Sequence, residues 1–137
     1  MKPTAILFVA SAFVALVVTT LAFADDGTRT SSPTFSRTPV PDARPLMLAA
    51  IHATDGEAHG ILTGDVADAI TRRFGATSPI FIDVTTKRRY QQPGCSRLKV
   101  TFWQEGVLLP GAKAARKQTM EFGINYCLDG LPPKSLL

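Results

Sequence analysis

Two histidines and two carboxylates lie within eight residues of each other, and these side chain types can bind a metal or transfer a proton. They are His52, Asp55, Glu57 and His59. The spacing differs from that of helical zinc sites, in which two histidines four residues apart flank a glutamate. Gly56 also favours a turn over a rigid element. We therefore expect polar turn residues here, with a metal-dependent hydrolase that uses His52 and His59 as an alternative.

The rest of the chain contains no familiar catalytic motif. It has no G-x-S-x-G nucleophile elbow, no phosphate-binding loop and no nucleotide-binding glycine pattern. Asp83 and Glu121 are carboxylates on expected strands and could share a cleft, but such pairs arise by chance on any small sheet. We therefore expect no enzymatic activity, no cofactor and no bound metal.

The amino terminus has the pattern of a secretory signal peptide. Lys2 supplies a positive charge, residues 5–21 form an apolar segment, and Ala22-Phe23-Ala24 resembles a signal peptidase site. A membrane anchor needs about 20 predominantly apolar residues, and this segment is shorter and ends in small and polar residues. We therefore predict that residues 1–24 are a signal peptide. The mature protein is then periplasmic or secreted by a bacterium, with no membrane span after cleavage.

Composition predicts one small domain with a modest positive charge. The 137-residue chain has 15 basic and 11 acidic side chains, a formal net charge of +4. Basic residues gather at residues 87–89 with Arg97 and Lys99, and again at residues 113–117. They do not form the dense stripe typical of a nucleic-acid-binding domain. We therefore do not expect nucleic acid as the partner.

The segment after the signal peptide is rich in Ser, Thr, Pro, Asp and Arg, and its prolines interrupt any periodicity. This composition is typical of a disordered tail. We predict a tail over residues 25–44 and a folded domain over residues 45–137.

Hydrophobic periodicity predicts one helix and three antiparallel strands in this domain. Val66, Ile70 and Phe74 recur every four residues, which indicates an amphipathic helix that begins near Asp65. Residues 80–90, and the segments around residues 98–102 and 120–124, alternate with the period of a strand. The apolar run over residues 46–51 fits either a strand or a helical turn, and we favour a strand.

The two cysteines, Cys95 and Cys127, test this arrangement. An even number of cysteines in an exported chain favours a disulfide. If the two residues face each other on antiparallel strands, the midpoint of the hairpin falls at Gly111, where Pro110-Gly111 is a turn signal. This register pairs only apolar residues on one face of the hairpin: Leu98 with Ile124, Val100 with Phe122, and Phe102 with Met120.

Trp103 lies in this register on the opposite face, which also holds the cysteines. Large aromatic residues on an outer face often mark recognition surfaces, although a terminal segment that covers the face would explain them equally well. We predict Trp103, Tyr126, Arg97 and Lys99 as binding residues.

Residues 94–98 (Gly-Cys-Ser-Arg-Leu) and 125–133 (Asn-Tyr-Cys-Leu-Asp-Gly-Leu-Pro-Pro) carry a family resemblance. The sequence there resembles small exported proteins of unassigned mechanism that accompany conjugation and type IV secretion genes on plasmids and other bacterial mobile elements. The resemblance covers roughly the last 90 residues and its motifs are structural, built from turn residues and paired cysteines. It implies an accessory role in conjugal transfer and carries over no catalytic residues.

Together these observations predict an α+β domain in which one amphipathic helix packs on a three- to four-stranded antiparallel sheet with one disulfide. The expected function is that of a non-enzymatic periplasmic accessory or binding protein, with an envelope or secretion-system protein as its partner. A secreted inhibitor of a muramidase-like enzyme is a further alternative, because small disulfide-linked domains are common in secreted proteins.

Overall fold

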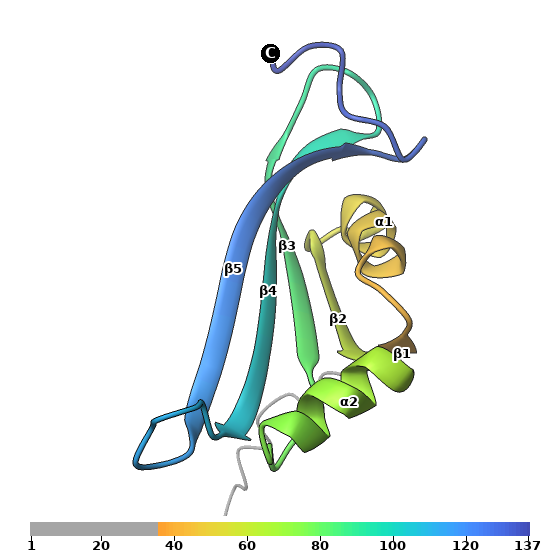
Figure 1. The fold of residues 1–137 in the computed structure, drawn as a ribbon. Coiled ribbons are helices and arrows are strands. Elements are labelled where there is room, and N and C mark those ends of the chain that lie inside the picture. The colour runs from red at the N-terminus through yellow and green to blue at the C-terminus, as the bar shows by residue number, and fades with distance from the viewer. Residues whose placement is uncertain (1–35) are drawn as a thin grey trace, which may run out of the picture. The chain divides into compact units, whose positions relative to one another are not determined.

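The computed structural model describes residues 36–137, which form a curved sheet with two helices (Figure 1). The predicted signal peptide and the tail up to residue 35 lie outside the described residues. The elements in chain order are β1 (Thr38–Val40), α1 (Arg44–His52), β2 (Glu57–Leu62), α2 (Asp65–Arg73), β3 (Phe81–Arg89), β4 (Cys95–Val107) and β5 (Arg116–Cys127).

The five strands lie in the order in which they occur in the chain. β1 and β2 are parallel, and the pairs β2–β3, β3–β4 and β4–β5 are antiparallel. An α+β fold with one disulfide is therefore confirmed, but the sheet has five strands and is mixed, and it carries two helices instead of one. The predicted helix is α2, and the predicted strand over residues 80–90 is β3.

The core lies between α1 and one face of the sheet. Alternate residues of a strand lie on the same face of the sheet. The buried residues of β3 and β4 follow this alternation and point toward α1. The core consists chiefly of Leu46, Met47, Ala50 and Ile51 from α1 and Ile82, Val84, Leu98 and Val100 from the sheet. α2 joins the same face, because the Gln104 side chain of β4 donates a hydrogen bond to Thr71 of α2 (2.8 Å).

The strand prediction for residues 46–51 was wrong, since these residues belong to α1. Pro45 lies in the first turn of this helix, a position that tolerates proline because its missing N–H needs no partner there. The buried residues of the helix recur with helical spacing: Leu46, Met47, Ala50 and Ile51. A run of six apolar residues contains too few turns for its period to decide between helix and strand.

Both ends of α1 are held by charged side chains. The Asp42 carboxylate accepts hydrogen bonds from the guanidinium and the backbone N–H (2.8 Å) of Arg44. These two bonds, the guanidinium bond first, lower the pKa of Asp42 to about 2. At the other end, the Arg89 guanidinium of β3 donates to the carbonyl oxygens of Ile51 (2.7 Å) and Ala53 (2.9 Å). These bonds satisfy carbonyl groups that a helix end leaves without internal partners.

Ordered structure begins before residue 45, so the predicted tail extends too far. β1 and the start of α1 lie within residues 25–44. β1 has three residues and contains Pro39, which is tolerated because β1 is an edge strand. Its order comes from pairing with β2, and the Thr63 backbone N–H donates to the Val40 oxygen (2.9 Å). Such long-range pairing leaves no local periodicity in the sequence.

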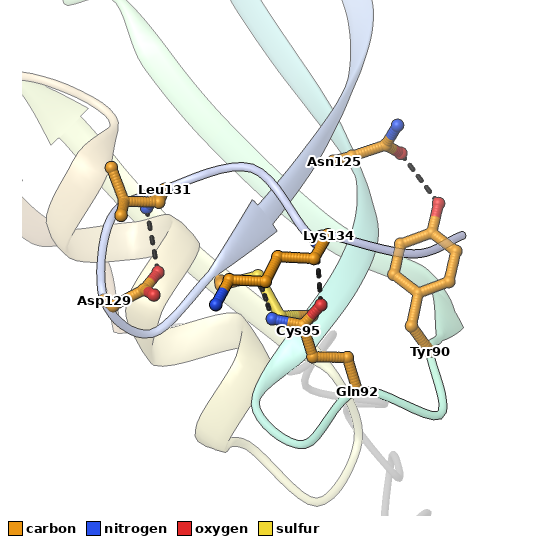
Figure 2. Close-up of a disulfide and its surroundings, with 8 residues drawn as sticks. Tyr90, Gln92, Cys95, Asn125, Asp129, Leu131 and Lys134 are labelled. Carbon is orange, nitrogen blue, oxygen red and sulfur yellow. Dashed lines mark hydrogen bonds between the residues drawn. A yellow bond between two sulfur atoms is a disulfide. The ribbon is translucent and has the colours of Figure 1, made fainter. Parts of the chain in front are cut away.

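The hairpin register derived from the cysteines is confirmed. Cys95 pairs with Cys127, and the three apolar pairs predicted above are all present on β4 and β5. The disulfide joins the two strands, with Cα atoms 4.0 Å apart (Figure 2). The carboxy-terminal tail folds back near this bond. The Lys134 backbone N–H donates to the side-chain oxygen of Gln92 (2.8 Å), and the Cys127 backbone N–H donates to the Leu131 carbonyl oxygen (3.0 Å).

Gly60 of β2 is required where α1 and β1 approach the sheet. A Cβ atom at this position would lie 2.6 Å from Leu46 Cδ1 and 2.8 Å from the Thr38 carbonyl oxygen. Backbone cannot move away as a flexible side chain can, so Gly60→Ala should lower the free energy of unfolding by about 1 to 3 kcal/mol. Urea denaturation measures this loss. Gly123→Ala is the matched control, because the three atoms nearest to a Cβ there all belong to the flexible Arg97 guanidinium. Equal stability of the two variants would contradict the close approach.

Candidate functional site

The face of the sheet opposite α1 and α2, here called the helix-free face, holds most of the predicted binding residues. Within the described part of the chain no helix covers it. Alternation along the strands directs these side chains to it: His59 of β2; Asp83 and Thr85 of β3; Arg97, Lys99, Thr101 and Trp103 of β4; and Thr119 and Glu121 of β5. The candidate site is therefore built on four neighbouring strands instead of on loops.

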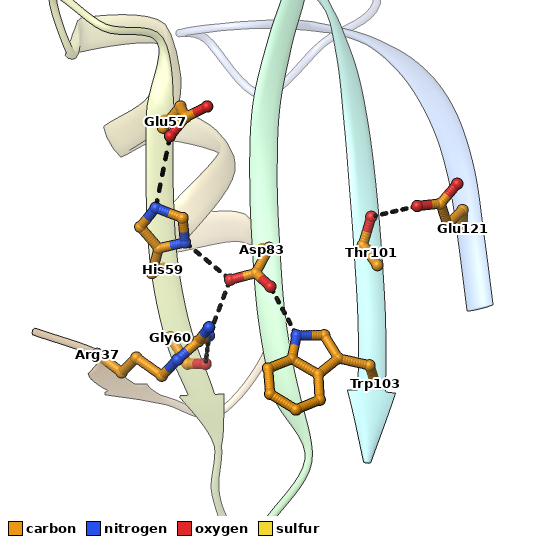
Figure 3. Close-up of polar contacts among 8 residues, drawn as sticks. All are labelled: Arg37, Glu57, His59, Gly60, Asp83, Thr101, Trp103 and Glu121. Atoms are coloured by element: carbon orange, nitrogen blue, oxygen red, sulfur yellow. Dashed lines mark hydrogen bonds and ion pairs between the residues drawn. The ribbon is translucent and has the colours of Figure 1, made fainter. Parts of the chain in front are cut away.

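Asp83 is the centre of this face (Figure 3). Its Oδ1 atom accepts hydrogen bonds from Arg37 Nη1 (2.8 Å) and His59 Nδ1 (2.7 Å), and its Oδ2 atom accepts from Trp103 Nε1 (2.6 Å). His59 also lies near Glu57, with 3.7 Å between Nε2 and Oε2. One carboxylate thus joins side chains from three strands and from the segment that precedes β1.

These bonds determine the charge of Asp83. Burial disfavours the charged form and by itself raises the pKa, but hydrogen bonds from His59, Arg37 and Trp103 outweigh this effect and hold the pKa of Asp83 below its ordinary value. Asp83 is therefore an anion at neutral pH. Because both of its oxygens already accept hydrogen bonds, it is suited to hold its neighbours in place and poorly suited to act as a proton donor or acceptor for a substrate.

Trp103 is held between aromatic and cationic groups. Its ring centroid lies 4.2 Å from that of Phe81, and the Lys117 ammonium lies 3.9 Å from the ring centroid. The Arg37 guanidinium lies 4.8 Å from the Phe81 ring and 5.3 Å from the Trp103 ring. Contacts of this kind stabilise one orientation of the indole. The Arg37 side chain therefore covers part of this face.

Next to Trp103 the face forms a shallow hollow of about 350 Å³. It is lined by Asp83, Thr85, Lys99, Thr101, Trp103, Lys117, Thr119 and Glu121. Glu121 Oε1 accepts from Lys99 Nζ (3.2 Å) and Thr101 Oγ1 (3.1 Å), and the bond from Lys99 is the main reason that the pKa of Glu121 is lowered. The hollow thus offers ammonium groups, carboxylates and hydroxyls beside one large aromatic ring.

The structure divides the four predicted binding residues between the two faces of the sheet. Trp103 and Lys99 line the hollow, and Arg97 lies farther along β4, where its Nη1 donates to Asn125 Oδ1 (3.1 Å). Tyr126 lies on the opposite face of the sheet, where it packs against the core beside α1. Tyr126 is therefore a core residue and does not extend the Trp103 surface.

The two histidines proposed as alternative metal ligands are not brought together. His52 ends α1, which packs on the face of β2 that holds Ala58 and Gly60, whereas His59 points to the helix-free face. Among residues 36–137, no group of three or more His, Cys, Asp or Glu side chains is arranged to hold a metal ion.

Sequence reasoning did not identify Arg37 and Phe81 as site residues, and it placed His59 in a turn. The alternation of Phe81 and Asp83 along β3 was visible, and a register between β3 and β4 would have placed Phe81 opposite Trp103. No comparable signal exists for Arg37, which lies in the segment predicted to be disordered.

No helix in the described range is long and apolar enough to cross a membrane. Comparison with known proteins assigns no family: no family model matches the chain, and neither curated proteins nor solved structures show a significant match to it.

Proposed function

We propose that this protein is a non-enzymatic binding protein of the bacterial periplasm that recognises a protein partner through the helix-free face around Trp103. The observation that carries the proposal is the bonded cluster of Arg37, His59, Asp83 and Trp103, which fixes an indole ring at the edge of an open hollow. Rigid aromatic and arginine side chains contribute strongly to protein interfaces because little conformational entropy is lost when they bind.

The chemistry of the hollow favours a protein over a small molecule. Lys99 and Lys117 lie beside Glu121 and Asp83, so the surface presents both charges within a small area. A partner surface that carries complementary charges and an apolar side chain for Trp103 matches this pattern. Because the hollow is open to solvent, it would enclose little of the surface of a small ligand, whereas it suits one anchor residue of a larger interface.

Export and a role in conjugal transfer are parts of this proposal that depend on the sequence. The disulfide is compatible with an oxidising compartment such as the periplasm. The association with conjugation and type IV secretion comes only from the resemblance of the segments around Cys95 and Cys127. Deletion of the gene in a donor strain tests this part: transfer frequency should fall, and an unchanged frequency would argue against the association.

The binding surface can be tested with Thr101→Arg. Thr101 lines the hollow and is half-buried, so a large cation there should block an anchor residue and weaken partner binding roughly tenfold or more. Ala69→Arg is the control, because Ala69 is exposed on α2 on the other side of the sheet.

The measurement is photo-crosslinking in the periplasm from a reactive amino acid at position 85, which also lines the hollow. A defined crosslinked protein should form in the parent chain and in Ala69→Arg, and its yield should fall in Thr101→Arg. Absence of a product, or equal yields in the two variants, would contradict the proposed surface. The identity of the product also distinguishes a transfer component from a muramidase.

A further inference from the structure

We propose that two copies of this protein form a two-fold symmetric dimer by pairing their β5 strands edge to edge. β5 spans Arg116–Cys127 and is the outermost strand of the sheet next to β4 (Figure 1). Among the described residues, nothing pairs with its outer edge. A long edge strand of this kind presents a row of backbone groups that can accept another strand. The proposed surface is the edge of β5, which lies beside the hollow at Trp103 and shares Glu121 with it.

The position of the disulfide shows which backbone groups of β5 point outward. The Cα atoms of Cys95 and Cys127 are 4.0 Å apart, the close spacing of a non-hydrogen-bonded antiparallel pair. In agreement, the Cys127 N–H donates to Leu131 and not to β4. Because backbone direction alternates along a strand, the outward N–H and C=O groups of β5 belong to Lys117, Thr119, Glu121, Gly123 and Asn125.

The apolar face of β5 is incompletely covered within the described chain. Met120 is 60% exposed and Phe122 is 42% exposed, although both lie on the face that packs against the helices. The Phe122 ring stacks on Phe102 with centroids 6.1 Å apart. Next to these residues an apolar hollow of about 450 Å³ extends between α2 and the far ends of β4 and β5. This surface gains stability if a neighbouring apolar strand is placed beside it.

One antiparallel register between β5 and β5 of a second copy both pairs the outward backbone groups and covers the exposed apolar residues. If Phe122 faces Phe122 of the second copy as a closely spaced pair, the outward groups of Glu121 and Gly123 bond to each other across the axis. Met120 then faces Ile124 of the second copy, so the three central pairs on this face are apolar, and Gln118 faces Tyr126 at each end of the ladder. A two-fold axis requires such self-complementarity of the surface.

Charge complementarity on the helix-free face favours the same register. The Arg97 guanidinium lies over Gly123 so closely that a Cβ atom there would clash with it. In the dimer, Glu121 of each copy lies opposite Gly123 of the other and therefore reaches the second copy's Arg97. Both known contacts of Glu121 use Oε1, which leaves Oε2 without a partner among the described residues. Because the dimer is two-fold symmetric, the ion pair between Glu121 and Arg97 forms twice.

The first test is the mass of the full-length exported protein in solution, measured by sedimentation equilibrium over a range of concentrations. We expect a reversible dimer, and a monomer at every soluble concentration would overturn the proposal. Glu121→Arg should weaken the dimer roughly tenfold or more because it places like charges opposite each other. The double variant Glu121→Arg with Arg97→Glu should restore it. Glu105→Arg, which alters an ion pair with Lys117 on the same face, is the control and should not change the mass.

The second test examines the register directly. Phe122→Cys places one thiol at the two-fold axis, where a closely spaced pair allows a disulfide between copies. Met120→Cys places its thiol opposite Ile124 instead, so the two thiols of the dimer are too far apart. Non-reducing electrophoresis should therefore show a covalent dimer for Phe122→Cys and not for Met120→Cys. Equal crosslinking of the two variants, or crosslinking of neither, would contradict this register.

Discussion

Replacement of Cys127 by Ser will lower the free energy of unfolding by about 3 to 4 kcal/mol, which is a large share of the stability of a domain of this size. The disulfide closes a loop with a sequence separation of 32 residues and so restricts the unfolded chain. Both cysteines are buried, and the covalent bond joins the ends of the two longest strands. The apolar pairs of the hairpin remain in the variant, so the domain should keep its fold.

Thermal denaturation with and without reductant measures this effect. The Cys127→Ser variant and the reduced parent protein should melt together, roughly 15 to 25 °C below the oxidised protein. Circular dichroism at low temperature should show the same strand content in all three samples. Equal melting temperatures of the oxidised and reduced protein, or two free thiols in the native protein, would show that the cysteines are not paired.

Asp83→Ala should have the second largest effect, a loss of about 2 to 4 kcal/mol. The substitution removes the acceptor of three donors at once and leaves the partly buried Arg37 guanidinium without its carboxylate. Arg37 and Asp83 are 21% and 27% exposed, so water can solvate the remaining groups only in part. Glu105→Ala is the control on the same face, because its carboxylate is well exposed and should contribute little.

The lowered pKa of Asp83 also predicts how stability depends on pH. The folded state favours the carboxylate, because the hydrogen bonds from His59, Arg37 and Trp103 outweigh the cost of its burial. This contribution is fully present above the pKa of the unfolded state, about 3.9, and is lost as the pH falls below it through the lower folded pKa. In Asp83→Asn this part of the acid dependence should be absent. Urea denaturation from neutral pH down to acid pH measures it, and parallel curves for the variant and the parent would contradict the assignment.

The cluster around Asp83 also connects stability to the proposed function. Trp103 is held by the same carboxylate whose loss destabilises the domain, so Asp83→Ala should free the indole and weaken partner binding as well. Thr101→Arg separates the two effects, because within residues 36–137 the Thr101 hydroxyl donates to Glu121 and is not one of the three donors to Asp83.

Patterns in the sequence were sufficient to predict α2, β3, the β4–β5 hairpin and the disulfide. Each of these elements is long enough for its period to appear, and the hairpin joins strands that are adjacent in the chain. The register followed because only one alignment brings Cys95 to Cys127 and pairs the apolar residues on one face. Local periodicity and a short connection are therefore sufficient for this part of the fold.

The identity of α1, the presence of β1 and the composition of the candidate site depend on contacts between distant parts of the chain and became visible in the folded structure. The apolar run in α1 is too short to show its period, and β1 has no apolar pattern, since it is ordered by pairing with β2. Asp83 binds Arg37, His59 and Trp103, which are 46, 24 and 20 residues away in the chain. Contacts over such separations depend on the order of the strands in the sheet and on the face that each side chain occupies. Hydrophobic patterns within single segments do not encode this order.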